Sequence, residues 1–482
     1  MNSIKFIPIL IVVISTTLLI SIAIWTSFIS SVVEETNENS ADESVVYNLN
    51  IIQNATTSVK GEGIQLTTTS HDLFHENSEG FAVYRLPAIV YHQQTFLVFC
   101  EGRKGTADSS ISQIVMKRGH LNGTKISWDQ TLTVVAKING TRLANPVPFV
   151  DKDTNTIFVA YNVLTAGITE PMFLAQDHYN QSILLIKSQD LGVTWSEPHN
   201  ITDETLGRMH PVPIFYAPGP GHAIQMKSGR LVMQGNYYYR EINSTHKTYK
   251  SNTTDHGVVF VSDNHGQNWR PGGFVPYAED NKGHAIDTSE SSVVELANNT
   301  LCINSRTLSK SQPRAQALST DGGDSFGSPV LVKELTEPEN IGDVASGCEG
   351  STLGFTAPKN WTKYGQVKSS ASDKEQPWVL FSNPADPFIR IFMSIRLSTD
   401  GCQTWSKPWT IWDLASGYSD LVQYDDANNK DYQGPRFGIV YENGYIDTVS
   451  TVSFMTFTLD DVRNGVKATK LRAELKQNQI VS

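Results

Sequence analysis

The sequence predicts an all-β protein, a six-bladed β-propeller that follows an N-terminal transmembrane helix. Three observations lead to this architecture. Short runs of β-branched and aromatic residues recur between turn residues along most of the chain. An eight-residue motif recurs four times in the same region. A long segment without charged residues precedes both features.

The uncharged segment spans residues 6–33 and includes a strongly apolar run at residues 9–14. It exceeds the roughly 20 residues that a membrane helix needs. Lys5 precedes it and Glu34 follows it, so the positive flank should remain in the cytoplasm. We therefore expect residues 1–33 to be a cytoplasmic end and a signal anchor. A cleaved signal peptide is the alternative, although its apolar region is usually only about 7 to 15 residues long.

The rest of the chain should lie outside the cytosol. Residues 34–63 are polar and lack periodicity, which predicts a stalk, and residues 64–482 form the predicted propeller. Asn-x-Ser/Thr sequons, which accept N-linked glycans in secreted proteins, begin at Asn54, Asn122, Asn139, Asn180, Asn200, Asn243, Asn252, Asn298 and Asn360. We expect a single-pass membrane protein with a luminal or extracellular body, at the plasma membrane, Golgi or lysosome.

The composition of the chain limits the classes of molecule that it is expected to bind. The chain has 38 Lys and Arg against 49 Asp and Glu, a net charge of -11, which argues against a nucleic-acid-binding surface. An anionic ligand would need a local basic pocket. The four cysteines are too scattered for a disulfide framework or a CxxC metal site. Four buried thiols and one or two disulfides both remain possible.

Several segments have the composition of buried strands. Helical spacing is rare, and its clearest example is the tail at residues 469–479. The strand-like runs include residues 96–99, 156–161, 183–186, 258–261 and 378–381.

The repeated motif has Ser, an acid two residues later, Gly four residues later and an aromatic residue seven residues later. Segments 188–195 and 319–326 fit it, with Trp195 and Phe326 as the aromatic residues. Segments 262–269 and 398–405 depart from it at Asn264 and Cys402. The acid should cap backbone amides in a tight turn, Gly should supply a positive φ, and the ring should hold the turn against its hairpin.

The motif recurs at intervals of about 60 to 80 residues, the size of a four-stranded blade with long loops. At about 70 residues per blade, residues 64–482 accommodate six blades.

Arg85 stands in the middle of an apolar strand, between Phe81-Ala82-Val83-Tyr84 and Leu86-Pro87-Ala88-Ile89. A guanidinium is costly to bury without an anion, so Arg85 needs an anionic partner. A structural ion pair is one possibility. A bound anionic ligand is the other.

Turn motifs with this pattern are called Asp boxes. The segment Tyr84-Arg85-Leu86-Pro87, followed by the four Asp boxes, resembles the sialidase (neuraminidase) family, and the resemblance covers residues 80–459. The resemblance implies a six-bladed propeller with its active site at the central axis. Non-enzymatic propellers also carry Asp boxes, so the site residues are the more specific test.

Sialic acid carries a carboxylate on its anomeric carbon, and bidentate guanidinium groups suit that anion. By resemblance, Arg85, Arg306 and Arg390 form the clamp. Tyr418, in Ser-Gly-Tyr-Ser-Asp, matches the family nucleophile. A neutral phenol avoids repulsion by the substrate carboxylate but needs a base, and Glu290 matches that base.

The resemblance makes Asp108 the proton donor for the leaving group, which requires a raised pKa. Glu442 should orient Arg85. The remaining residues implied around the sugar are Arg103, Asn145, Glu170, Tyr237, Tyr239 and Glu349.

Two positions depart from the family pattern. Glu349 stands where relatives have Gln, so a further acid should lie near the sugar and alter preference or pH dependence. Ala144 replaces a larger apolar residue and should enlarge that side of the pocket. Neither change removes a catalytic group.

We therefore expect a membrane-anchored, retaining exo-α-sialidase that acts on glycoproteins, gangliosides or oligosaccharides, with no metal or other cofactor. A trans-sialidase and a sialic-acid-binding propeller without catalysis are the alternatives. The presence of Asp108, Glu290 and Tyr418 argues against the second alternative.

Overall fold

The structure is a computed structural model that describes residues 66–176, 179–239, 255–309, 312–340, 346–358, 377–425 and 434–481. They belong to one compact unit, Gln65–Ser482. The predicted membrane helix and stalk lie outside the described residues. Within the described part of the chain, no helix has the length and apolar character needed to span a membrane.

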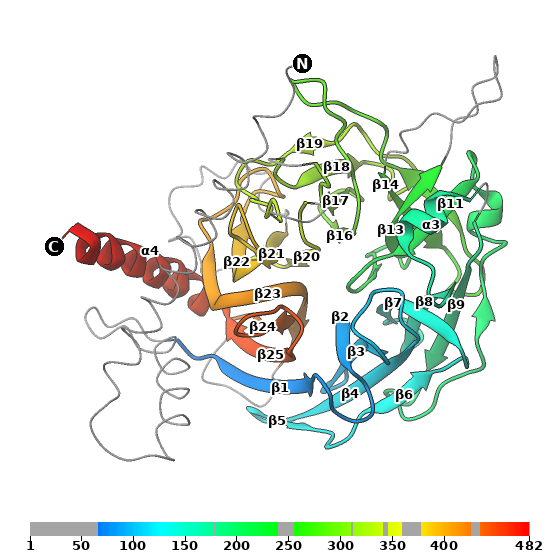
Figure 1. The fold of residues 1–482 in the computed structure, drawn as a ribbon, viewed down its shortest axis with the longest axis horizontal. Coiled ribbons are helices and arrows are strands. Elements are labelled where there is room, and N and C mark those ends of the chain that lie inside the picture. The colour runs from blue at the N-terminus through cyan, green and yellow to red at the C-terminus, as the bar shows by residue number, and fades with distance from the viewer. Residues whose placement is uncertain are drawn as a thin grey trace, which may run out of the picture. The chain divides into compact units, whose positions relative to one another are not determined.

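The described strands pair into four sheets of seven, nine, five and four strands, and within these sheets they form six successive groups of antiparallel strands around a central axis (Figure 1). The first group is β2 (Val83–His92), β3 (Thr95–Arg103) and β4 (Ser112–Asn122), with β5 (Lys125–Trp128) and β6 (Thr133–Ala136) paired to β4. The second is β7 (Thr141–Asp151), β8 (Thr156–Thr165), β9 (Ser182–Ser188) and β10 (His199–Asn200). The third is β11 (Pro213–Pro218), β12 (Ile224–Gln225), β13 (Leu231–Tyr239), β14 (Asp255–Ser262) and β15 (Arg270–Phe274).

The other three groups complete the ring. The fourth is β16 (Ser291–Glu295), β17 (Leu301–Ser305), β18 (Ala315–Ser319) and β19 (Val330–Leu331). The fifth is β20 (Ser351–Phe355), β21 (Trp378–Pro384), β22 (Ile391–Ser398) and the start of β23 (Trp409–Tyr424). The sixth is the end of β23, β24 (Arg436–Asn443), β25 (Thr451–Thr458) and β1 (Thr69–His75). The fold is therefore mostly β and has the form of a propeller.

The ring is closed by the first described strand. β1 pairs antiparallel with β25, from Thr69 opposite Thr456 to His75 opposite Thr451. The beginning of the propeller is thus held by its end, which leaves no open gap between the first and last groups.

The Asp boxes form the turns that their pattern predicts. In the first box, Ser188 Oγ lies 2.7 Å from Asp190 Oδ1, which also accepts the N–H of Thr194 at 2.9 Å. The box at residues 398–405 keeps the same hydrogen bonds although Cys402 replaces Gly, and Cys402 adopts a φ of 67°. The local serine and acid therefore define the turn, and the glycine position tolerates Cys.

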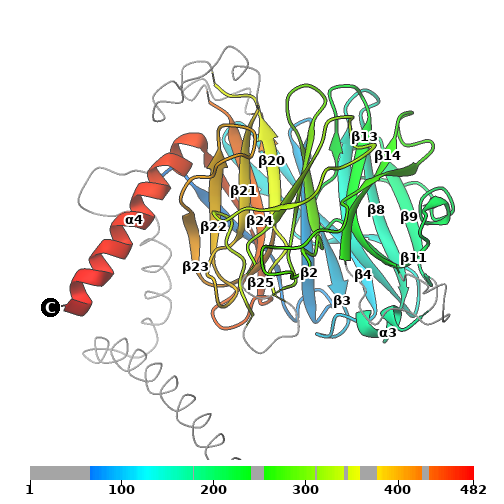
Figure 2. The same ribbon diagram turned by 90° about the horizontal axis from the view of Figure 1, so that it is seen from above.

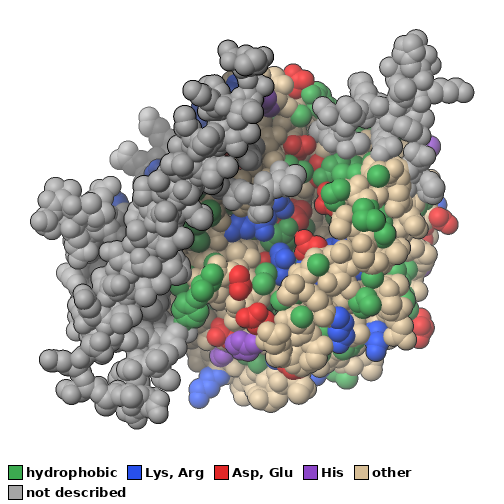
Figure 3. Space-filling view, viewed as in Figure 1, with side chains coloured by type: hydrophobic (Ala, Val, Ile, Leu, Met, Phe, Trp, Pro, Cys, Tyr) green, Lys and Arg blue, Asp and Glu red, His purple; other side chains and the backbone are tan. Residues whose placement is uncertain are grey.

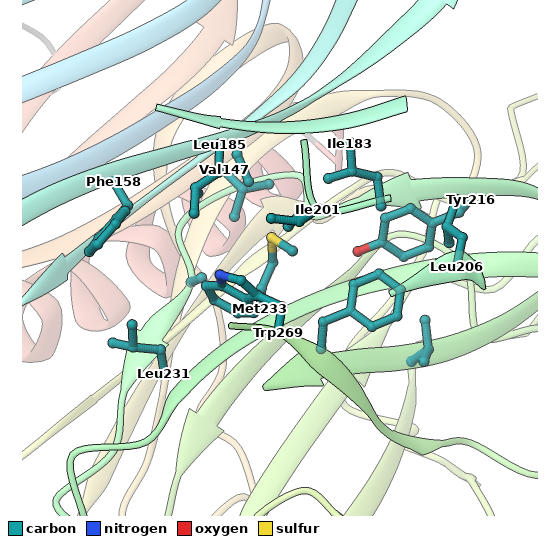
Figure 4. Packing of buried hydrophobic residues seen from close by; sticks show 14 of the residues in the cluster. Val147, Phe158, Ile183, Leu185, Ile201, Leu206, Tyr216, Leu231, Met233 and Trp269 are labelled. Carbon is teal, nitrogen blue, oxygen red and sulfur yellow. The ribbon is translucent and has the colours of Figure 1, made fainter. Parts of the chain in front are cut away.

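The aromatic rings of these boxes do more than hold their own hairpins. Trp195 follows β9 in the second group but meets Phe99 of the first group edge to face, with ring centroids 5.9 Å apart. Trp269 follows β14 in the third group and packs against Phe149 of the second, in the cluster shown in Figure 4. We expected each ring to pack only against its own hairpin. Trp195 and Trp269 instead also pack between their own strand group and the neighbouring one.

Among the described residues, three helices accompany the strands: α3 (Glu170–Leu174), the 3-10 helix η1 (Leu206–Arg208) and α4 (Leu459–Val481). The last begins ten residues before the predicted helical tail and contacts β22, β23 and β25 at the side of the propeller (Figure 2). Leu459 and Val462 anchor it in the cluster around Trp409.

All four cysteines are buried free thiols. Of the two alternatives that the sequence left open, free thiols and disulfides, the structure therefore has the free thiols.

Replacing Trp269 should destabilise the propeller. This side chain is only 1% exposed, and Trp269→Ala leaves a cavity between two strand groups, which typically costs about 3–5 kcal/mol. Val193→Ala is the control, because Val193 is 61% exposed and its truncation should cost less than about 0.5 kcal/mol. Urea denaturation compares the variants. Equal midpoints would contradict the proposed packing role of the ring.

Candidate active site

A cavity of about 630 Å³ opens at the centre of the ring, and side chains from all six strand groups or their connecting loops line it. Basic and acidic side chains gather in this hollow in the space-filling view (Figure 3). Ten polar side chains that line the cavity are the candidates for binding and catalysis: Arg85, Arg103, Asp108, Arg142, Asn145, Glu170, Glu290, Arg306, Arg390 and Tyr418.

A β-bulge aims Arg85 into this cavity. The pairing of β2 with β3 shifts register between Arg85 and Ala88, and Leu86 within the bulge has a φ of 54°. A non-glycine residue in the left-handed region is uncommon, and bulges beside active sites commonly redirect a side chain. Pro87 lacks an N–H group, so the interrupted ladder loses no donor at that residue.

Glu442 on β24 neutralises Arg85. Its Oε1 accepts hydrogen bonds from Arg85 Nε at 2.7 Å and from the N–H of Leu86 at 2.9 Å, and its Oε2 accepts the N–H of Tyr418 at 3.0 Å. The Glu442 side chain has no solvent exposure. One carboxylate therefore orients the arginine, the bulge and the tyrosine segment together.

The backbone at Gly417 must allow Glu442 this close. A Cβ on Gly417 would collide with Glu442 Oε2, so any other residue would displace the carboxylate. β23 shifts register against β24 between Ser416 and Ser419, which makes this a second bulge next to the cavity. Glycine is thus required at position 417 by the close approach of Glu442.

Three guanidinium groups surround Tyr418. Those of Arg85 and Arg390 lie 5.4 and 5.7 Å from the centre of its ring. Arg306 Nη1 donates to Tyr418 Oη at 3.2 Å. Arg390 donates from Nη2 to the carbonyl of Gly347 at 3.0 Å, and the described atoms give its buried Nε no partner. The arrangement can bind a carboxylate close to the phenol oxygen.

Tyr418 donates a short hydrogen bond from Oη to Glu290 Oε1, and Glu290 Oε2 lies 2.8 Å from Arg306 Nη1. Burial and the Glu290 charge raise the pKa of the Tyr418 phenol well above its usual value, although Arg306 and Arg390 act in the opposite direction. The phenol is therefore neutral in the empty site. Glu290 is placed to take its proton.

Asp108 lies on the loop after β3, and its side chain is 74% exposed to the cavity. It pairs with Arg103 and lies 3.5 Å from Arg85 Nη1. Desolvation works to raise the pKa of the Asp108 carboxyl, but the charges of Arg103 and Arg85 hold it below the usual value. In the empty site Asp108 is therefore ionised. The raised pKa that an acid needs would have to come from a ligand that occupies these arginines.

Arg103 and Asn145 are fixed through Glu101. Glu101 Oε2 lies 2.7 Å from Arg103 Nε, and its Oε1 accepts the N–H of Asn145 at 2.8 Å. The Asn145 side chain donates to the carbonyl of Pro218 at 3.1 Å. Both predicted residues line the cavity, with Glu101 supporting them from behind.

On β13 the structure corrects two predicted residues. Tyr238 lines the cavity and hydrogen-bonds Glu170 and Asp255, whereas Tyr237 packs in the hydrophobic cluster and stacks on Tyr239. Successive side chains of a strand point to opposite faces, so a shift of one residue exchanges the set that meets the ligand. The assignment of Tyr237 and Tyr239 to the wall was wrong by one position.

Glu349 also lies elsewhere than expected. Its residue exposure is 1%, it does not line the cavity, and its Oε2 accepts the N–H of Ser419 at 2.9 Å. It supports the floor from below. Ala144 is likewise fully buried, packed behind Phe173 and Phe215 of the wall.

Sequence reasoning missed Arg142, at the start of β7, which lines the cavity and influences Asp108 electrostatically. Its signal was an arginine three residues before Asn145, at the cavity end of an inner strand, as Arg85 is on β2. Among the described residues, Asp151, Asp153 and His265 could together hold a metal, but Asp151 already accepts hydrogen bonds from Gln225 and Thr154.

Comparison with known proteins decides the family. Residues 94–432 match the family described as BNR repeat-like domain. The chain is 28% identical to mouse Sialidase-3 over 388 residues, covering 74% of this chain and 88% of that protein. It is also 28% identical to human Sialidase-4, covering 84% of this chain and 96% of that protein.

The chain belongs to the sialidase family.

Solved sialidase structures share its fold. A Hadza microbial sialidase superposes with a TM-score of 0.62 at 20% identity, covering 82% of this chain and 69% of that one. Trypanosoma rangeli sialidase in complex with sialic acid gives a TM-score of 0.59 at 16% identity, covering 85% of this chain and 61% of that one. These likenesses confirm the propeller.

Removing Glu442 should weaken both the fold and the site of this sialidase. Glu442→Ala leaves Arg85 nearly buried without its carboxylate, and breaking a buried ion pair typically costs about 3–5 kcal/mol. Chemical denaturation measures the loss, with Glu197→Ala, which removes an exposed acid, as the control. If both variants unfold at the same denaturant concentration, Glu442 does not neutralise Arg85 as described.

Proposed function

We propose that this chain is a retaining exo-α-sialidase that releases terminal sialic acid from glycoproteins, gangliosides or oligosaccharides. The observation that carries the proposal is the convergence of Arg85, Arg306 and Arg390 on the Tyr418–Glu290 pair inside an open cavity. Sialic acid has its carboxylate on the carbon that is attacked. A site for it therefore needs an anion clamp and a nucleophile at the same place.

The arginines bind and orient the substrate carboxylate. Arg306 and Arg390 keep their guanidinium planes beside the phenol through the carbonyls of Ser346 and Gly347, while Glu442 holds Arg85. A carboxylate nucleophile would be repelled by the bound anion, whereas the neutral Tyr418 phenol is not. This choice explains why a tyrosine occupies the position usually given to a second acid.

In the first step, Tyr418 Oη forms a bond to the anomeric carbon while Glu290 takes the phenol proton. The bond from that carbon to the leaving oxygen breaks, and Asp108 supplies the proton that this oxygen needs. In the second step, Asp108 takes a proton from water, the water oxygen bonds to the anomeric carbon, and the bond to Tyr418 breaks as Glu290 returns the proton to the phenol. Two displacements retain the configuration of the sugar.

Substrate binding changes the pKa of the Asp108 carboxyl. In the empty site the charges of Arg103 and Arg85 lower the pKa of its carboxyl. A substrate carboxylate on Arg85 offsets part of that positive charge and adds a negative one nearby. Both effects raise the pKa of Asp108, so the proton is gained when it is needed.

The activity can be tested with the full chain and a fluorogenic sialoside, with and without lactose. We expect release of free sialic acid in both reactions, with the α-anomer formed first in proton NMR. Diversion of the sugar to sialyllactose would identify a trans-sialidase instead. If no sialic acid is released but sialic acid binds saturably, the protein is the alternative, a sialic-acid-binding propeller without catalysis.

Tyr418→Phe separates chemistry from binding. The variant lacks the nucleophilic oxygen but keeps the ring between Arg85 and Arg390, so turnover should fall by at least about 100-fold while affinity for sialic acid changes little. Steady-state kinetics and calorimetric titration with sialic acid measure the two quantities. Retention of wild-type turnover would remove Tyr418 from the proposed role.

We also propose the predicted topology, a signal anchor with the propeller outside the cytosol. The asparagines of all five sequons among the described residues are exposed, which supports access for glycosylation: Asn122, Asn139, Asn180, Asn200 and Asn298. Treating the cell-expressed protein with an N-glycosidase should increase its gel mobility. Unchanged mobility, with a glycosylated protein shifting in the same sample, would count against a luminal propeller.

A further inference from the structure

Glu349 is a buried acid directly beneath the proposed nucleophile. It lies just before β20, is 1% exposed, and its only hydrogen bond among the described atoms is from the N–H of Ser419 to Oε2. Its Oε1 is buried without a partner in the described part of the chain. Ser419 follows Tyr418 in β23, so this bond, together with that from the N–H of Tyr418 to Glu442, holds the strand segment that presents the phenol.

Three acids close to Tyr418 have basic partners, whereas the buried Asp255 near Tyr238 is held by the Asn236 amide. Glu290 pairs with Arg306, Glu442 with Arg85, and Asp420 with His222, at 2.8, 2.7 and 2.7 Å. Arg314 is the nearby cation, but Glu337 already pairs with it at 2.7 Å in full burial. Within the described residues, no basic side chain forms an ion pair with Glu349.

A carboxylate in this position would be poorly stabilised. An ionised carboxylate needs several donors or a cation when it is buried, and Glu349 has one backbone donor. Burial raises the pKa of the Glu349 carboxyl well above its usual value, and the Asp420 and Glu290 charges raise it further, against smaller opposing effects of Ser419 and Arg314. The titratable groups that face it are Glu290, Arg314, Cys348 and Asp420.

We propose that Glu349 is a positioning residue that acts as an uncharged carboxylic acid, and that loss of its proton as pH rises switches the sialidase off. The inference rests on the proposed function for its catalytic part. Uncharged Glu349 holds the N–H of Ser419 and so seats Tyr418. Ionised Glu349 places a further negative charge beneath Tyr418, where it repels the substrate carboxylate, and its Oε1 is then a charged, buried oxygen without a donor among the described residues.

The matched variant is Glu349→Gln, which keeps the shape and the acceptor oxygen but cannot ionise. At pH about 5, kcat/KM of this variant should stay within about threefold of the wild type, because both side chains are then neutral. On the alkaline side, the fall of kcat/KM should move upward by at least about one pH unit in the variant. Glu197→Gln, an exposed acid-to-amide change, should leave the profile unchanged.

Protonation is tested separately from activity by thermal unfolding between pH 4 and 9. A raised pKa in the folded state gives stability that is present below the unfolded pKa and is lost as pH rises through the folded pKa. The melting temperature of Glu349→Gln minus that of the wild type should therefore increase with pH. The infrared spectrum of the wild type minus that of Glu349→Gln at pH 6 should also show the carbonyl band of a protonated carboxylic acid, because other buried acids contribute equally to both spectra.

The outcomes separate the two claims. A constant difference in melting temperature and no carboxylic acid band would overturn the uncharged state of Glu349. A confirmed uncharged state with superimposable pH profiles would overturn its control of catalysis. If neither protein cleaves any sialoside, the proposed function fails, while the melting and infrared measurements still decide the charge of Glu349.

Discussion

The site depends on the cost of burying a guanidinium group. Arg85, Arg103, Arg306 and Arg314 enter the centre of a propeller, and each is matched by a buried or half-buried carboxylate at 2.7 or 2.8 Å. The separation along the chain differs between the pairs. Glu442 lies 357 residues from Arg85 and on another strand, whereas Glu101 lies two residues from Arg103 on the same strand, β3. Pairing neutralises each charge, and in the Arg85–Glu442 pair it also fixes the position of the strand that carries the acid. Glu442 is the clearest case, because it binds Arg85 and the backbone on either side of the site.

Regular strands could not present these groups, and the inner strands depart from regularity where the chemistry lies. β2 is bulged at Arg85, β7 between Ala144 and Val147, and β23 between Ser416 and Ser419. Asn145 has a φ of 55°, in the same left-handed region as Leu86. Such residues persist only where surrounding structure fixes them. Here Glu442 and Glu101 do so, through hydrogen bonds to the N–H groups of Leu86 and Asn145. The same carboxylates that pair with the arginines therefore also stabilise the irregular backbone of the bulges.

Much of this protein follows from local sequence. Alternating β-branched and aromatic runs mark the strands, and the predicted runs at residues 96–99, 156–161, 183–186, 258–261 and 378–381 all fall within strands. The Asp boxes fold as local turns because their hydrogen bonds join residues two to four positions apart. The role of their aromatic rings was less predictable. Trp195 and Trp269 pack against neighbouring strand groups, and no local pattern says which surface a ring will meet.

The sequence alone determined an all-β chain of repeated units and, through family resemblance, Tyr418 and every charged side chain that lines the cavity except Arg142. Tertiary structure decided which of three consecutive tyrosines lines the cavity: alternate residues of a strand share a face, and the orientation of β13 places Tyr238 on the cavity side. It also decided that Glu349 lies beneath the floor, without an ion-pair partner in the part of the chain that the structure describes, and that Arg142 lines the cavity. Charge state and exposure depend on neighbours brought together by folding, so they belong to the assembled ring and not to any segment of it.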